Sequence, residues 1–387
     1  MANLLEDVLA ELNKSVFYRE FSFSKNKFTP SPGVEMEFAD HVIWIDDLLM
    51  IYQLKEREAG GTASAGSERK WFRSSVIGKG SKQVRDTLRF LKEHPEIRIE
   101  NQRGHVFDVK SASIKKMAKL IVYAPGKALL ADCLEVRHHL SKTGGGFIHV
   151  LQWTDYLGIC RTLVTPAEVV EYLEFREQMI RHWASRIQTP SEVALVGQFL
   201  SGDQGSPKES FAEYARRLKQ EYGEFDLSHV LGKIGEHIDS IEGGTGAETD
   251  YYRMLAEFAK LNRSQLKEVR KRFYMCLDSA KKGEFLVPNR VIVPDTGCGF
   301  VFITVEPSNI DRRLIGGRNL TLGAKYEQRL DRQVGISFAW RDGEFLIEWW
   351  HLEFPWEEDT EMEDGLRSMN PFPSLRGQVR ERYEFDN

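Results

Sequence analysis

Helical spacing of apolar residues marks four segments of the chain as amphipathic helices. In such a helix, apolar residues at i, i+3, i+4 and i+7 share one face. Thr165 and Pro166 begin one of these segments as a cap and a first-turn proline, and Ser81 is the expected cap of another. The four segments are residues 3–14, 81–94, 165–183 and 251–282.

Strands are predicted where apolar residues alternate with polar ones or run on for four to eight positions. In the first half of the chain these stretches are 41–45, 48–57, 97–102, 105–109, 119–124 and 146–153. Beyond Gly283 the strand pattern returns over 285–294 and 299–306. It ends in an expected hairpin, 335–354, with Asp342-Gly343 at its turn. The connections 29–33, 59–67 and 241–248 are rich in Gly, Pro or small polar residues and are expected to be loops.

This order of elements predicts an α+β or α/β protein with three regions and a tail. Gly, Ser, Pro and Gln gather between residues 187 and 210, which indicates a boundary there. We expect loose order in the acidic stretch after Trp356 and in the last residues. The expected regions are a domain over 1–186, a mainly helical region over 187–282, a β-rich domain over 283–370, and a tail over 371–387.

Composition is that of an ordinary globular protein, but charge is distributed unevenly. The 387 residues carry a net charge of −5. Residues 55–119 nevertheless hold 16 Lys and Arg against 8 Asp and Glu, whereas the stretch 342–364 is acidic. The four cysteines are far apart and show no zinc-finger spacing, so a reducing cytoplasm is the expected location. Neither a signal peptide nor an apolar run long enough for a membrane span is expected.

One predicted strand ends in polar residues, Gln53 and Lys55, on a face that is apolar up to that point. If Asp46-Asp47 forms a two-residue turn, Asp40 lies opposite Gln53, with their Cβ atoms about 4.5–5.5 Å apart. Asp40, Gln53 and, diagonally, Lys55 then share one patch. A loop of odd length would shift this register.

These groups suit the hydrolysis of a phosphodiester bond. Oxygen ligands hold Mg²⁺, or Mn²⁺ in its place, and the metal lowers the pKa of a bound water. Asp40 is the expected anionic ligand, the side-chain oxygen of Gln53 a neutral one, and the Leu54 carbonyl a third. Lys55 would orient the water and offset the negative charge that develops in the transition state.

The stretch around these residues resembles the PD-(D/E)xK superfamily of restriction-endonuclease-like nucleases. In that pattern, an acid-bearing helix is followed by an aspartate at the start of a hairpin, (D/E)xK at the end of the next strand, and a further helix. Gln53-Leu54-Lys55 has glutamine in place of the usual acid, a form that occurs in the Mrr-like branch. The resemblance implies an αβββαβ core within residues 3–125.

The resemblance implies roles for further residues. The acid of its first helix falls on Glu6 or, as the less favoured choice, Glu11. Glu35 and Glu37 are alternative ligands in the sequence. The helix after the motif would meet the backbone phosphates of nucleic acid. Its candidate contacts are Lys79, Lys82, Gln83 and Arg85.

We therefore expect a Mg²⁺-dependent nuclease that acts on DNA, with restriction or another defence against foreign DNA as an association. Because of Gln53, a second hypothesis keeps the fold without the catalysis, as a nucleic-acid-binding or scaffolding subunit. A third is a protein-interaction module that uses the aromatic and acidic C-terminal region, with no salt-dependent affinity for DNA. The helical and C-terminal regions would supply recognition, regulation, or contacts with a protein partner or a second copy.

Two other motifs are expected to be structural. Asp295-Thr296-Gly297 is similar to an aspartic protease signature, but those enzymes need two aspartates that share a proton, and the sequence has no second copy. We expect a turn between strands there. Trp349 and Trp350 are adjacent, so strand alternation directs one of them inward, and ordinary core packing is expected.

Overall fold

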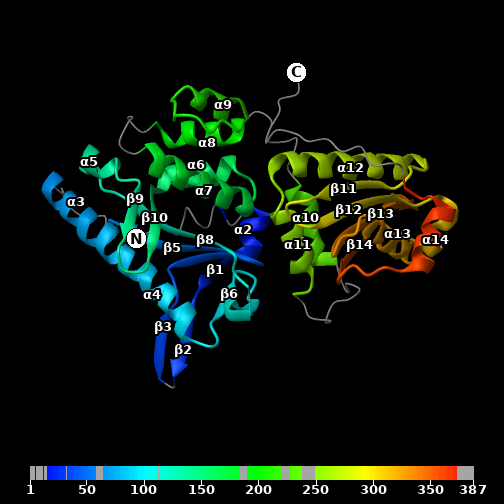
Figure 1. Ribbon diagram of the computed structural model, residues 1–387, viewed down its shortest axis with the longest axis horizontal. Helices are drawn as coiled ribbons and strands as arrows, with labels where there is room; N and C mark the ends of the chain where they lie inside the picture. Colours follow the sequence, from blue (N-terminus) through cyan, green and yellow to red (C-terminus); the bar gives the residue numbers. More distant parts are fainter. Residues whose placement is uncertain are drawn as a thin grey trace. The chain divides into compact units, whose positions relative to one another are not determined.

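The computed structural model divides the chain into two compact units, Met1–Gln220 (unit 1) and Glu221–Asn387 (unit 2). Figure 1 shows their helices and strands, and each unit is described by itself. Within the part of the chain that the structure describes, no helix is long and apolar enough to cross a membrane. The described residues are 5, 12, 15–31, 33–57, 64–111, 113–183, 190–218, 227–237 and 249–372.

Unit 1 is built on an eight-stranded mixed sheet, in the order β7-β6-β1-β4-β5-β8-β10-β9 (Figure 1). β1, β4 and β5 are antiparallel neighbours, whereas β8 and β10 run parallel to β5. The strands are β1 (Ser22–Lys25), β4 (His41–Ile45), β5 (Leu48–Glu56), β6 (Arg98–Asn101), β7 (Val106–Asp108), β8 (Lys116–Ala124), β9 (His138–Ser141) and β10 (Gly146–Gln152). A separate hairpin, β2 (Lys27–Ser31) and β3 (Val34–Glu37), comes between β1 and β4 in the chain.

Helices cover both faces of this sheet, which explains why β5 is apolar on both sides. On one face, Phe90 of α4 packs with Leu49 and Ile51 of β5. On the other, Tyr156 of α6 packs edge to face against Tyr52. The helical elements are α2 (Val16–Phe21), α3 (Ala65–Trp71), the π-helix η1 (Phe72–Lys79), α4 (Gly80–Glu93), the short η2 (Val109–Ser111), α5 (Ala131–Leu134), α6 (Trp153–Thr162), α7 (Pro166–Trp183), α8 (Glu192–Ser201) and α9 (Phe211–Leu218).

Unit 2 contains a four-stranded sheet in the order β11-β12-β13-β14, also with helices on both faces. Trp349 lies near Phe258 and Phe273 on one face. Trp350 packs on the other face, so close to Gly317 that a Cβ there would lie 2.3 Å from its ring. Both tryptophans therefore serve the core, as expected. The elements are α10 (Ser228–His237), α11 (Tyr251–Ala259), α12 (Arg263–Lys282), β11 (Asn289–Val293), β12 (Cys298–Thr304), η4 (Pro307–Arg312), α13 (Arg313–Glu327), β13 (Arg332–Arg341), β14 (Glu344–Glu353) and α14 (Thr360–Met369).

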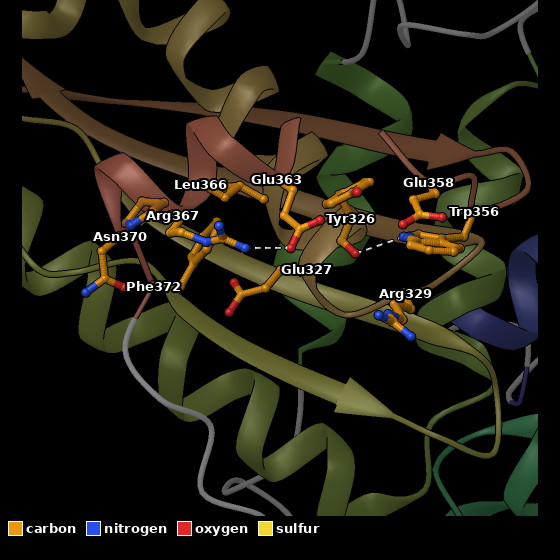
Figure 2. A pocket seen from close by; sticks show the side chains of 11 residues that line it. Tyr326, Glu327, Arg329, Trp356, Glu358, Glu363, Leu366, Arg367, Asn370 and Phe372 are labelled. Atoms are coloured by element: carbon orange, nitrogen blue, oxygen red, sulfur yellow. Dashed lines mark hydrogen bonds and ion pairs between the residues drawn. The ribbon is translucent and has the colours of Figure 1, made fainter. Parts of the chain in front are cut away.

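A hollow of about 300 Å³ lies in unit 2 beside the end of α13 and beside α14 (Figure 2). The Trp356 indole N–H donates to the Tyr326 carbonyl at 3.0 Å, and the Arg329 guanidinium lies over the Trp356 ring. Glu363 and Arg367 of α14 form an ion pair at 2.9 Å. These contacts join five of the residues that line the hollow.

The fold class agrees with the sequence: a mixed α and β protein with a large N-terminal sheet, a helical middle and a C-terminal sheet. Thr165 accepts the Glu168 N–H at the start of α7, as a cap does. The Asp342-Gly343 turn has positive φ at both residues, as a tight hairpin requires. The helices expected over 187–282 divide between the units: α8 packs against α6 and α7 in unit 1, whereas α10, α11 and α12 belong to unit 2.

Several boundaries were wrong, mostly where a polar residue caps a helix. Ser81 is buried inside one continuous helix that begins at Ala65, with Ser64 as its cap. This overturns the last part of the loop expected over 59–67, of which 59–63 lie outside the described residues, as do 241–248. The helix expected over 251–282 ends at Ala259 and restarts after Asn262, which forms a capping box with Gln265.

Two further expectations were wrong for the same kind of reason. Part of the acidic stretch after Trp356 is helical, because Asp359 accepts the Met362 N–H and starts α14. Of the loop expected over 29–33, residues 29–31 belong to β2, and Gly33, whose φ of +80° favours glycine, lies in the turn that precedes β3. Asp295-Thr296-Gly297 is a turn between β11 and β12, as expected.

Candidate active site

The β4–β5 hairpin has the register that the sequence predicts. Ile45 pairs with Leu48 and His41 pairs with Tyr52, so the connection is a two-residue turn. Asp46 adopts a positive φ of 51°, which a tight turn of this kind needs. Continuing the register by one residue places Asp40 opposite Gln53, just beyond the His41–Tyr52 pair.

Asp40, Leu54 and Lys55 meet at this end of the hairpin. The Asp40 Oδ2 atom accepts a hydrogen bond from the Leu54 N–H at 2.6 Å and another from the Lys55 ammonium at 3.0 Å. The ammonium also donates to the Leu54 carbonyl at 2.8 Å. The exposed fraction is 20% for the Asp40 side chain and 9% for Lys55. The ion pair is therefore shielded from bulk water yet reachable at Asp40.

Gln53 is buried, and its side-chain oxygen lacks a hydrogen-bond partner among the described residues. A buried acceptor left unpaired costs about 1–3 kcal/mol, so its retention calls for an explanation. Ile121 of β8 is the register partner of Gln53, and Gly80 of α4 lies directly over it. A Cβ at Gly80 would lie 3.0 Å from the Ile121 side chain, so α4 passes close above this end of the sheet.

Two titratable residues beside Asp40 have shifted pKa values. Partial burial and the neighbouring Asp40 carboxylate raise the pKa of Glu37, against an opposing effect of Lys27 and Lys55. Complete burial lowers the pKa of His41 to about 4, so this ring is neutral at pH 7. Glu37 therefore places a second carboxyl group within the electrostatic reach of Asp40.

The other acids expected at the site are not brought to it by the described residues. Glu6 and Glu11 lie outside those residues, although the neighbouring Leu5 N–H donates to the Glu56 carboxylate at the end of β5, at 3.2 Å. Glu35 forms an exposed ion pair with Lys27 at 2.8 Å. Of the two alternative ligands named from the sequence, Glu37 is thus the one whose carboxyl interacts with Asp40.

The expected nucleic-acid contacts share the long helix formed by α3, η1 and α4. Lys79 and Lys82 are exposed, and Lys82 pairs with Asp86 at 2.7 Å. Arg85 donates to the Ser141 hydroxyl at 3.4 Å, whereas the Gln83 side-chain oxygen is buried without a partner among the described residues. Residues 65–93 carry eight Lys and Arg against three Asp and Glu. This helix is therefore the basic element of unit 1.

Two supporting residues had no signal in the sequence. The Thr87 hydroxyl of α4 donates to the Phe38 carbonyl at 2.6 Å. The Asn26 amide donates to the carbonyls of Phe23 and Ala39 at 2.7 and 3.2 Å. Both contacts fix the segment that leads into Asp40. Hydrogen bonds to a non-repetitive backbone follow no periodicity, so hydrophobic patterning cannot reveal them.

Hard cations such as Mg²⁺ prefer oxygen ligands. Among the described residues, no group of three or more His, Cys, Asp and Glu is arranged to hold a metal. The oxygens here are of mixed kind: the Asp40 carboxylate, the Leu54 carbonyl and the unpaired Gln53 amide oxygen. Mg²⁺ and Mn²⁺ accept such oxygens and keep several waters. The unpaired Gln53 oxygen is the observation that makes the residues fit.

Comparison of the chain with family models, curated proteins and solved structures finds no match.

Proposed function

We propose that this protein is a metal-dependent nuclease that hydrolyses phosphodiester bonds of DNA at the end of β5. One observation carries the proposal: the Asp40 carboxylate, the Leu54 carbonyl and the Lys55 ammonium meet at the end of β5, where the buried Gln53 oxygen has no partner among the described residues. A carboxylate and a lysine held together at the end of a strand are the groups that phosphodiester hydrolysis with a hard cation uses.

The order of elements around the site supports the proposal. The antiparallel strands β1, β4 and β5 precede α4 in the chain, and β8, which is parallel to β5, follows α4 after β6 and β7. The proposal takes these elements as the βββαβ part of the core that the resemblance to PD-(D/E)xK nucleases implies. The link to defence against foreign DNA rests on that resemblance alone.

Each residue would have a distinct role. Asp40, Gln53 and the Leu54 carbonyl would hold Mg²⁺ or Mn²⁺, which when bound supplies a Lewis acid and a water of lowered pKa. Lys55 would keep its proton on Nζ and donate to a phosphate oxygen, offsetting the charge of the transition state. The cations of the long helix, Lys79 and Lys82 among them, would hold the backbone phosphates.

One observation favours a second candidate, a nucleic-acid-binding protein without catalysis. The Lys55 ammonium contacts both Asp40 and the Leu54 carbonyl, two of the three atoms that would hold the metal. The site is thus neutralised by its own lysine, and glutamine stands at the position of the second acid. Such a protein would bind DNA with a salt dependence set by its phosphate contacts, with or without a divalent metal.

Cleavage of plasmid and linear DNA with Mg²⁺ or Mn²⁺ tests the two candidates. We expect Asp40→Ala and Lys55→Ala each to lower the cleavage rate by at least about 100-fold, the size of effect seen when one transition-state contact is removed. Asp47→Ala is the matched control, because Asp47 is an aspartate at the opposite end of the same hairpin, beside Lys115. Its rate should equal that of the wild type.

The outcomes separate the candidates. Metal-dependent cutting that is lost in both site variants and kept in Asp47→Ala supports the nuclease. A wild type that binds DNA but cuts neither substrate with either metal favours the binding protein instead. Cutting that survives in Asp40→Ala would contradict the proposed site.

A further inference from the structure

A hollow of about 410 Å³ opens on unit 1 beside the candidate active site. Its lining residues come from β1, β2 and their connection, and from β3, β6 and β7, and β2 contacts β6. Its volume is within the range of pockets that take small molecules or parts of larger ones. Among the residues that line it are Asn26, Lys27, Glu37, Arg98, Ile99 and Val106.

The hollow and the site share a wall and an end of the sheet. Glu37 lines the hollow and interacts electrostatically with Asp40 and Lys55. In the register of β1 with β4, the end of β1 continues toward Asp40, and β6 is the next strand beyond β1. Two strand spacings are about 10 Å. If one monomer of a polymer is bound at Asp40, the adjacent monomer would therefore reach the hollow.

Asn26 supplies a polar group whose orientation is fixed. Its exposed fraction is 2%, and its amide nitrogen donates to the Phe23 and Ala39 carbonyls. Because the amide oxygen points away from the nitrogen, it is turned from those carbonyls, and it lacks a partner among the described residues. Ala39 directly precedes Asp40, so the Asn26 side chain in the wall of the hollow also braces the backbone that leads into the site.

The remaining walls suit a nucleotide. Lys27 and Arg98 form exposed ion pairs with Glu35 and Glu96, which are weak and can exchange for contacts with a phosphate. The apolar wall consists of the buried Ile99 and of Val106, which is 54% exposed although it is a large hydrophobic residue. An apolar wall and two cations match the face and the phosphate of a nucleotide, and the hollow also carries the carboxylates of Glu37 and Glu100.

We propose that this hollow holds an unpaired nucleotide of the strand whose phosphodiester lies at Asp40 and Lys55. The inference rests on the proposed function for its substrate class, and it adds that the substrate is single-stranded, or opened, next to the reacting bond. A base in a duplex must be unstacked before it enters such a hollow, so single-stranded DNA pays the smallest energy to bind.

Binding without cleavage is the direct test. Fluorescence anisotropy with the full-length protein in EDTA compares a labelled 12-nucleotide single strand with the same sequence as a blunt duplex. We expect tighter binding of the single strand. Val106→Glu places a carboxylate in the hollow and should weaken that binding by about tenfold, since one lost contact to a base has an effect of this order.

Val34→Glu is the matched control. Val34 is also an exposed valine on a short hairpin strand, 47% exposed, and it does not line the hollow. Its affinity for the single strand should equal that of the wild type. Arg98→Ala is a second variant on the hollow, and it should weaken binding and reduce its salt dependence, whereas the exposed, ion-paired Arg341→Ala should do neither.

The results that would contradict this inference differ from the results that would contradict the proposed function. Equal affinity for single strand and duplex, or equal effects of Val106→Glu and Val34→Glu, overturns the nucleotide in the hollow even if the protein cuts DNA. Selective binding of the single strand that Val106→Glu weakens supports the hollow even if no metal produces cleavage. A wild type that binds neither DNA at low salt contradicts both proposals.

Discussion

Two clusters of charged and polar side chains in the described part of unit 1 differ in how completely their hydrogen bonds are satisfied. One cluster surrounds Arg176 of α7 and Glu192 of α8. The Arg176 guanidinium is completely buried, bonds both Glu192 oxygens at 2.7 and 3.2 Å, and donates to the Arg137 carbonyl at 3.1 Å. The Tyr172 hydroxyl also donates to Glu192. The other cluster is the candidate site at Asp40, Gln53 and Lys55.

The difference between these clusters separates a structural role from a chemical one. Burial alone would raise the pKa of Glu192, but the Arg176 and Arg137 cations reverse this and lower it below its ordinary value. That carboxylate is thus committed to its partners. At the candidate site Asp40 is partly exposed, and the buried Gln53 oxygen has no partner among the described residues. Unpaired polar atoms beside an accessible carboxylate indicate a binding or catalytic site.

The largest expected effect concerns the Arg176 cluster. Arg176→Met should lower the free energy of unfolding by about 3–5 kcal/mol, because it leaves the Glu192 carboxylate buried without its main partner. Thermal or denaturant unfolding measures this change. Arg181→Ala on the same helix is the control: its ion pair with Glu177 is exposed, and its effect should be close to zero. A stable Arg176→Met protein would show that this cluster is not structural.

The next effect is a pH dependence that comes from His41, beside Asp40. The pKa of His41 is about 4 in the folded protein and about 6.5 in an unfolded chain. The unfolded state therefore binds the proton more readily, and stability is lost as pH falls from about 6.5 to about 4. The loss reaches roughly 3 kcal/mol at the acid end.

His41→Phe tests this pH dependence, since phenylalanine keeps a ring against Tyr52. Its free energy of unfolding should fall less steeply than that of the wild type between pH 6.5 and pH 4. His182→Phe, a change at an exposed position, should leave the wild-type slope unchanged. Parallel curves for His41→Phe and wild type would mean that His41 does not titrate in this range.

The sequence predicted the parts of the site that depend on strand periodicity. Alternation along β5 and the two-residue turn after Ile45 were sufficient to place Asp40 opposite Gln53. The same patterning predicted most strands of both sheets, because each has a face that must be buried. Glu37 was named only as an alternative ligand, since its approach to Asp40 depends on the β2–β3 hairpin.

Features that depend on long-range contacts could not be predicted in this way. The π-helical segment η1 joins α3 to α4, so Ser81 lies inside a continuous helix. The sequence placed a helix start at Ser81 because the apolar stripe appeared to begin there. The bond from Thr87 to Phe38 spans 49 positions and has no local signature. The helix starts at Asn262 and Asp359 were missed for a different reason: each is defined by a cap, which hydrophobic periodicity does not weigh.

The smallest effect gives the sharpest comparison of the two clusters, because its sign is opposite to that of Arg176→Met. Gln53→Leu removes a buried acceptor that has no described partner and replaces it with an apolar side chain of similar size. Stability should therefore stay the same or rise by about 1 kcal/mol, whereas metal-dependent cleavage is lost. Gln53→Glu is the companion variant: it should lower stability without metal and strengthen the stabilisation that Mn²⁺ gives in thermal unfolding. If Gln53→Leu lowered the free energy of unfolding as much as Arg176→Met does, the role of Gln53 would be structural. The case for a metal at this position would then fail.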